Sequence, residues 1–94
     1  RKGSAMRILA LWAAKSGKPA SVSGFEFSTA SKLGLRVEHI DIESYQGEQL
    51  VKQYRVSSLP TIIALSNAGM VLQTWSGYDQ PTAEQLEYYI ERGQ

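Results

Sequence analysis

The sequence predicts a single α/β domain in which four strands form one mixed sheet with three helices on its two faces. Two observations predict this class. Short apolar runs alternate with segments of helical periodicity through the first half of the chain, and the last two runs adjoin through a tight turn. Alternating strands and helices favour parallel pairing, whereas a tight turn imposes antiparallel pairing, so the sheet has to be mixed. The expected order of elements is βαβαββα.

The first strand and the first helix are predicted from the residues before Gly34. Residues 6–12 are an apolar run typical of a strand buried on both faces. Pro19 suits the first position of a helix, and apolar residues recur at helical spacing over 22–33. Gly24 inside this span weakens the helical propensity, and Gly34 is typical of a helix end.

The middle of the chain predicts a second strand and helix, followed by a hairpin. Residues 36–42 alternate apolar and polar side chains, as a strand does. Apolar residues over 50–54 indicate a short amphipathic helix after Gly47. Residues 62–65 form another buried strand, and the Ser-Asn-Ala-Gly sequence at 66–69 is typical of a tight turn.

A strand and a helix complete the domain. Residues 70–75 are expected to pair with the preceding strand across the turn. Asp79–Pro81 is expected to open the last helix, and Gly93 lies past its end. The apolar residues of this helix share one face: Ala83, Leu86 and Ile90.

The composition excludes several classes of protein. No apolar run approaches the roughly 20 residues that a membrane-spanning helix needs, so we expect no membrane protein. Ten basic and nine acidic residues give a formal charge of +1, which offers no electrostatic reason to expect nucleic acid or anionic lipid as a partner. Cysteine is absent and His39 is the single histidine, so we expect no disulfide, no metal site and no cofactor.

The first residues of the sequence do not continue the pattern of the fold. Residues 1–5 are interpreted as a remnant of the expression vector, with Met6 as the natural start and 6–94 as a single domain. The apolar run after Met6 is too short for a secretory signal, so the expected location is cytoplasmic.

Three sequence features resemble the thioredoxin family. They are the Trp-Ala-Ala turn at 12–14, the segment Tyr-Arg-Val-Ser-Ser-Leu-Pro-Thr at 54–61, and Ser-Gly-Tyr at 76–78. The resemblance covers about 7–91 and lacks the N-terminal strand and helix of full-length thioredoxins. It implies a thioredoxin-like fold and a cis peptide bond between Leu59 and Pro60.

The residues that carry the chemistry of thioredoxins are missing. The two cysteines of the Cys-x-x-Cys motif correspond to Ser16 and Pro19, and the buried acid of the first strand corresponds to Ala10. Lys15 occupies the position of the tryptophan that precedes the first cysteine in thioredoxins, and Gly24 occupies the position of the proline in their first helix. A serine hydroxyl has neither the acidity nor the redox couple that thiol–disulfide exchange needs. Both natural loss of this chemistry and an engineered replacement at Ser16 remain open.

Other chemistry finds little support in the sequence. If Ser16 lies at a helix N-terminus, its turn could hold an anion with help from Lys15 and Lys18, but a solvated capping turn explains the same residues. A serine–histidine hydrolase would need His39 beside Ser16. We expect His39 instead to form a surface pair with Asp41, which shares its strand face.

What remains is a binding surface. In thioredoxins three loops form a shallow apolar groove that holds an extended segment of a partner, and the residue before the cis-proline offers its backbone for strand-like pairing. A tryptophan at position 12 is explained equally well by packing in the core as by a place in the groove. The side chain of Trp75 can face either side of its strand. The resemblance carries the groove onto Trp12, Ser16, Gly17, Lys18, Leu59, Pro60, Gly77 and Tyr78.

The expected function is therefore that of a redox-inactive, thioredoxin-like module that binds another protein through an extended segment in this groove. The alternative is a thiol–disulfide oxidoreductase, of thioredoxin or glutaredoxin type, whose active-site cysteine is substituted in this chain. A structural subunit that assembles with another chain through the same fold is a third hypothesis.

Overall fold

The computed structural model describes residues 6–92, so 1–5 and Gly93 lie outside the described part of the chain. One four-stranded sheet has the order β2-β1-β3-β4. β1 (Arg7–Trp12) pairs parallel with β2 (Val37–Asp41) and antiparallel with β3 (Thr61–Leu65), which pairs antiparallel with β4 (Val71–Ser76). The predicted mixed sheet is confirmed.

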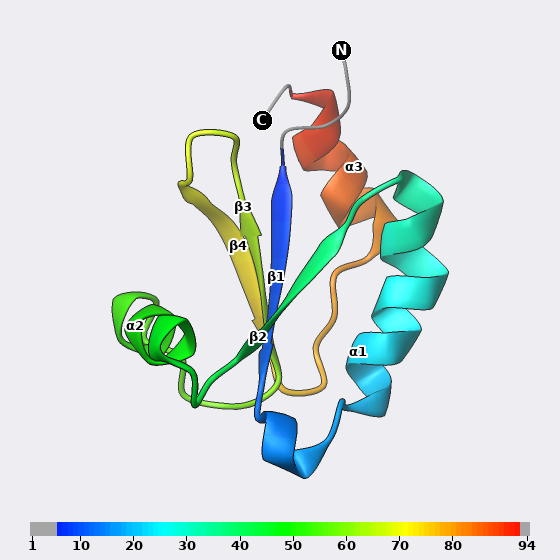
Figure 1. Ribbon diagram of the computed structural model, residues 1–94. Helices are drawn as coiled ribbons and strands as arrows, with labels where there is room; N and C mark the ends of the chain where they lie inside the picture. The colour runs from blue at the N-terminus through cyan, green and yellow to red at the C-terminus, as the bar shows by residue number, and fades with distance from the viewer. Residues whose placement is uncertain (1–5, 93–94) are drawn as a thin grey trace.

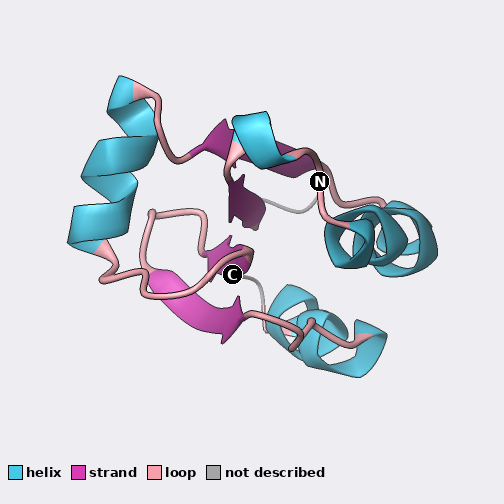
Figure 2. Ribbon diagram, turned by 90° about the horizontal axis from the view of Figure 1, so that it is seen from below, coloured by secondary structure: helices cyan, strands magenta, loops and turns pink. Residues whose placement is uncertain are grey.

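Helices cover both faces of the sheet. α1 (Ala20–Phe25) continues without a break through a π-helical turn (Glu26–Ala30) and a 3-10 turn (Ser31–Leu33) to Gly34, which ends it in the left-handed conformation with φ 73°. In Figures 1 and 2, α2 (Tyr45–Gln53) lies on one side of the sheet, and α1 lies with α3 (Ala83–Glu91) on the other. The predicted order is confirmed.

The alternation of β1 divides the core between these two faces. Ile8 and Ala10 lie beneath α1 and α3, whereas Leu9 and Leu11 lie beneath α2. All four are at most 2% exposed, which explains why residues 8–11 of this strand are apolar without interruption. Trp75 is buried on the face of α1 and α3, and its Nε1 donates a hydrogen bond to Gln85 Oε1 at 3.2 Å.

Two helices begin directly after residues whose side chains cap them. These starting points differ from those predicted from glycine and proline in the sequence. α2 begins at Tyr45, before Gly47, because Ser44 Oγ accepts the Gly47 N–H at 2.9 Å. α3 begins at Ala83, because Thr82 and Gln85 form a capping box, and the prediction that Asp79–Pro81 opens this helix is wrong.

A third helix start differs by one residue. Pro19 precedes α1 at the N-cap, with φ −63° and ψ 142°, so it does not occupy the first helical position.

Gly47 allows α2 to approach the end of β2 closely. It is buried, and a Cβ atom at this position would collide with the carbonyl group of Asp41 and with the Cα of Ile42. Both obstacles are backbone atoms, which cannot move aside as a side-chain tip can. Gly24 is the opposite case, because it lies inside α1 and no atom stands within 4 Å of its Cβ direction.

The two glycines predict opposite effects of the same substitution. We expect Gly47→Ala to lower the free energy of unfolding by about 1–3 kcal/mol, through the backbone shift that it forces. Gly24→Ala should raise it by about 0.5–1 kcal/mol, because alanine restricts the unfolded chain and favours the helix. Urea denaturation of both variants measures the difference, and a stable Gly47→Ala protein would contradict the close approach of α2.

Candidate functional site

Three connections meet at one end of the sheet and enclose a groove. They are the segment between β1 and α1, the loop before β3 and the loop after β4. The groove has a volume of about 630 Å³, and most of its surface is apolar. All eight residues named from the sequence line it, together with Ala13, Pro19, Ala20, Ser21 and Ser58. Whether they bind a partner remains a prediction.

The sheet brings these segments together. β1 ends at Trp12, and β3 runs antiparallel to it, so Thr61 at the start of β3 lies opposite Leu11. β4 runs antiparallel to β3 and ends with Ser76 opposite the same Thr61. The loop after β4 is then held by Gly77, whose φ is 64° and whose N–H donates to the Pro60 carbonyl at 2.8 Å.

The loop before β3 leaves a backbone pair free at the groove. The Leu59–Pro60 peptide bond is cis. Thr61 Oγ1 donates to the Ser58 carbonyl at 2.6 Å, and the Pro60 carbonyl is taken by Gly77. Between these two, the N–H and the carbonyl of Leu59 have no hydrogen-bond partner in the described structure. The side chains beside them are accessible, with Leu59 40% and Tyr78 95% exposed.

The turn around Ser16 is not a helix N-terminus, so the condition under which it could hold an anion is not met. Ser16 ends a 3-10 turn (Ala14–Ser16), and its N–H donates to Ala13, while that of Gly17 donates to Ala14. The α-helical turns begin only at Ala20. No helix N-terminus is therefore present at Ser16 to receive a negative charge.

Both lysines of this turn are also paired within the chain. Lys15 Nζ lies 3.0 Å from Glu43 Oε2, and Lys18 Nζ lies 2.7 Å from Glu26 Oε1. Neither ammonium group is left unpaired for an anionic ligand. Among residues 6–92, Lys18 is the one charged residue that lines the groove, so its pairing with Glu26 leaves the groove nearly neutral.

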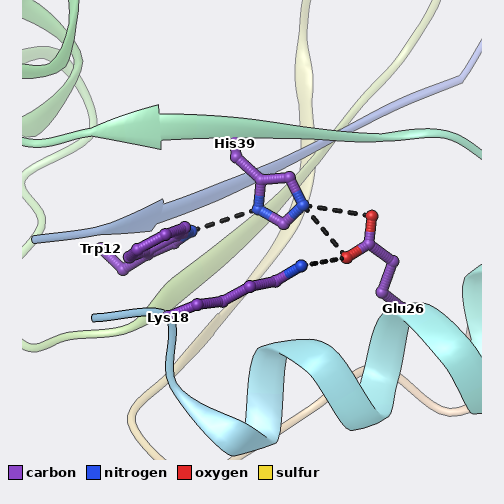
Figure 3. A network of polar contacts seen from close by, with 4 residues as sticks. All are labelled: Trp12, Lys18, Glu26 and His39. Carbon is purple, nitrogen blue, oxygen red and sulfur yellow. Dashed lines mark hydrogen bonds and ion pairs between the residues drawn. The ribbon is translucent and has the colours of Figure 1, made fainter. Parts of the chain in front are cut away.

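His39 joins this turn to the first helix through a polar network, which Figure 3 shows. Its Nδ1 accepts a hydrogen bond from Trp12 Nε1 at 3.2 Å, and its Nε2 lies 3.1 Å from both carboxylate oxygens of Glu26. The predicted His39–Asp41 pair is wrong, because Asp41 instead accepts hydrogen bonds from the backbone N–H groups of Ala14 and Glu43. With both ring nitrogens engaged, His39 cannot act as the base of Ser16.

Glu26 is the functional candidate that sequence reasoning missed. Its hydrogen bond from Lys18 holds the pKa of its carboxyl below the ordinary value, an effect that burial opposes and His39 reinforces. Glu26 lies on a helix without a recognisable motif around it. Its place over His39 depends on how α1 packs on β2, which no local pattern encodes.

The position that matches the buried acid of thioredoxins is filled by a methyl group. Ala10 is fully buried at the centre of β1. Residues 6–92 include no cluster of three or more potential metal ligands and no helix long and apolar enough to cross a membrane. The full sequence contains no cysteine, so this chain has no thiol chemistry.

Comparisons with known proteins agree with this geometry. No protein-family model matches the sequence, and neither does any curated protein. Solved structures do match. Thioredoxin-2, described as a component of the protein secretion machinery of a malaria parasite, superposes with a TM-score of 0.67 at 20% identity, over 98% of this chain and 86% of that one.

Two further thioredoxins align nearly as well. Deadhead, a germline-specific thioredoxin of Drosophila melanogaster, gives a TM-score of 0.65 at 24% identity, over 93% of this chain and 79% of its own. The thioredoxin of Fasciola hepatica gives 0.64 at 18% identity, over 95% and 81%. Together with the sheet order and the helices on both faces, these similarities show that the chain has a thioredoxin-like fold without cysteine.

Proposed function

We propose that this protein is a redox-inactive, thioredoxin-like binding module that holds an extended segment of another protein in the groove. The observation that carries the proposal is the free N–H and carbonyl of Leu59 at the groove surface. An extended segment can pair with such a residue as a short added strand, because one residue then supplies both a donor and an acceptor.

Hydrogen bonds alone give little affinity. Each contributes a net of about 0.5–1.5 kcal/mol, so apolar anchors have to supply the rest. The side chains of Leu59 and Tyr78 stand exposed on the two loops that flank the groove, and Trp12 is half-buried in its wall. This surface suits a partner segment with apolar side chains and no charge at its centre, because Lys18 is already paired with Glu26.

The alternative function is that of an oxidoreductase whose cysteine is substituted at Ser16. Ser16 is exposed and lines the groove, so a thiol at this position would be reachable. The surroundings favour the binding role, because the N–H groups of Ser16 and Gly17 are already bonded to carbonyls of the turn and Pro19 cannot act as a resolving thiol. A cytoplasmic location stays a prediction.

Substitution of Ser16 by cysteine distinguishes the two functions. We expect the Ser16→Cys protein to reduce insulin disulfides, with dithiothreitol as the electron source, no faster than a Ser23→Cys control with an exposed thiol on α1. Because the chain then holds no second cysteine, a mixed disulfide at position 16 is released only by dithiothreitol, as it is at position 23. Catalytic turnover above that control would instead support a substituted oxidoreductase.

Matched substitutions test the groove itself. A peptide selected from a random phage-displayed library on the wild-type protein serves as the probe. Leu59→Ala and Tyr78→Ala should each weaken its binding by roughly tenfold or more, because truncation of a central anchor typically costs about 2 kcal/mol. Val71→Ala and Tyr45→Ala are controls of similar exposure outside the groove, at 43% and 79%.

The binding role would be wrong if the groove variants and the controls bind the peptide equally well. The same result for a natural complex would favour a structural subunit that assembles through another face. Fluorescence anisotropy of the labelled peptide measures all four variants under one condition.

A further inference from the structure

The network of Trp12, His39, Glu26 and Lys18 contains an imidazole ring, which exists in a neutral and a protonated form. Histidine changes from one form to the other between about pH 5 and 8. His39 is also the single histidine of the sequence. Its side chain is 29% exposed, so solvent protons reach it. One ring nitrogen contacts Trp12 and the other contacts Glu26, on opposite sides of the ring (Figure 3).

The two contacts of the ring assign its neutral tautomer. Trp12 Nε1 carries a hydrogen and can only donate, so His39 Nδ1 has to accept and cannot carry a proton. The proton of the neutral ring is then on Nε2, where it donates to the Glu26 carboxylate at 3.1 Å. Because the pKa of Glu26 is lowered, its carboxylate stays charged over the range in which histidine titrates.

Protonation affects the two contacts in opposite ways. The imidazolium keeps its Nε2–H and gains attraction to the Glu26 carboxylate, which also holds Lys18 Nζ at 2.7 Å. At Nδ1 the new N–H faces the N–H of Trp12, and two donors cannot form a hydrogen bond. Proton uptake therefore breaks the contact with Trp12 and leaves the ion pairs of His39 in place.

The effect of a positive charge on His39 depends on the charged groups around it. On its own face of the sheet they are Glu26 and Lys18 from the α1 side and Asp41 two residues along β2. Lys15, in the connecting turn, is paired with Glu43. β1 contributes uncharged Trp12, and the pair of Arg7 and Glu38 lies on the other face because strand side chains alternate.

Trp12 is where this change reaches the groove. The indole forms part of the groove wall, and it also lines a second cavity of about 230 Å³ together with Ala14, His39, Ile40 and Asp41. An indole released from His39 therefore has open space beside it in which to change its orientation. We propose that His39 is a proton-operated latch, which holds Trp12 in the groove wall when neutral and releases it when protonated. Its effect on a partner rests on the binding function proposed above.

The latch is tested first in the free protein, without any partner. In a ¹⁵N-labelled sample at about pH 8, the imidazole nitrogens should show the Nε2–H tautomer. As the pH falls to about 5, the indole N–H resonance of Trp12 should shift with the same midpoint as the His39 ring. Trp75 is the internal control, because its Nε1 donates to the amide of Gln85, which does not titrate.

A second variant separates the latch from general acid effects. His39→Asn places an acceptor near Nδ1 and does not titrate, so the Trp12 indole resonance should stay constant over the same range. The latch is overturned if the ring is found as the Nδ1–H tautomer, or if His39 titrates while the Trp12 indole resonance does not move.

The consequence for binding has its own readout. For the selected peptide, the affinity of the wild-type protein should fall by about 2- to 12-fold on protonation, the equivalent of one hydrogen bond. The affinity of His39→Asn should not change. Equal wild-type affinity at both pH values overturns the regulatory role while the binding function stands. If no peptide binds at either pH, the binding function and its regulation both fail, and the resonances still decide the latch.

Discussion

The position of β1 at the centre of the sheet is the constraint on which the rest of the structure depends. Its parallel pairing with β2 requires a crossover, which α1 supplies, and its antiparallel pairing with β3 brings the start of that strand beside Trp12. Because both faces of β1 are covered, its side chains fix the two cores at once. The groove is a consequence of this register, since its three loops leave the sheet at the same end.

The same constraint determines the groove independently of the Cys-x-x-Cys motif that thioredoxins carry beside it. A cysteine pair is a local feature of the turn at 16–19, whereas the free backbone of Leu59 depends on the strands. A groove of this shape therefore does not require thiols in the turn. In this chain the N–H groups of Ser16 and Gly17 are bonded within the turn, Lys15 and Lys18 are paired with Glu43 and Glu26, and the backbone N–H and carbonyl of Leu59 stay free at the groove.

The sequence was sufficient to predict what periodicity and short motifs encode. The order of strands and helices along the chain and the helix end at Gly34 follow from local patterns, and the residues that line the groove follow from the resemblance. The sequence-based predictions are wrong where one residue is compatible with two local structures. Gly47 resembles a break between elements, yet it lies inside α2 because the helix packs against backbone. Strand alternation puts His39 and Asp41 on the same face, but the contact of His39 is with Glu26 of the helix that covers this face. Which side chain of that helix faces His39 depends on tertiary packing, which a local pattern does not encode.

The central claim is that the backbone of Leu59 receives the partner segment. Hydrogen exchange of the Leu59 amide, measured by NMR with and without the selected peptide, tests it most directly. The account predicts that this amide exchanges freely in the unbound protein and becomes protected when the peptide binds, because its N–H then has an acceptor. A bound peptide that leaves the Leu59 amide as exchangeable as before would contradict strand-like pairing in the groove.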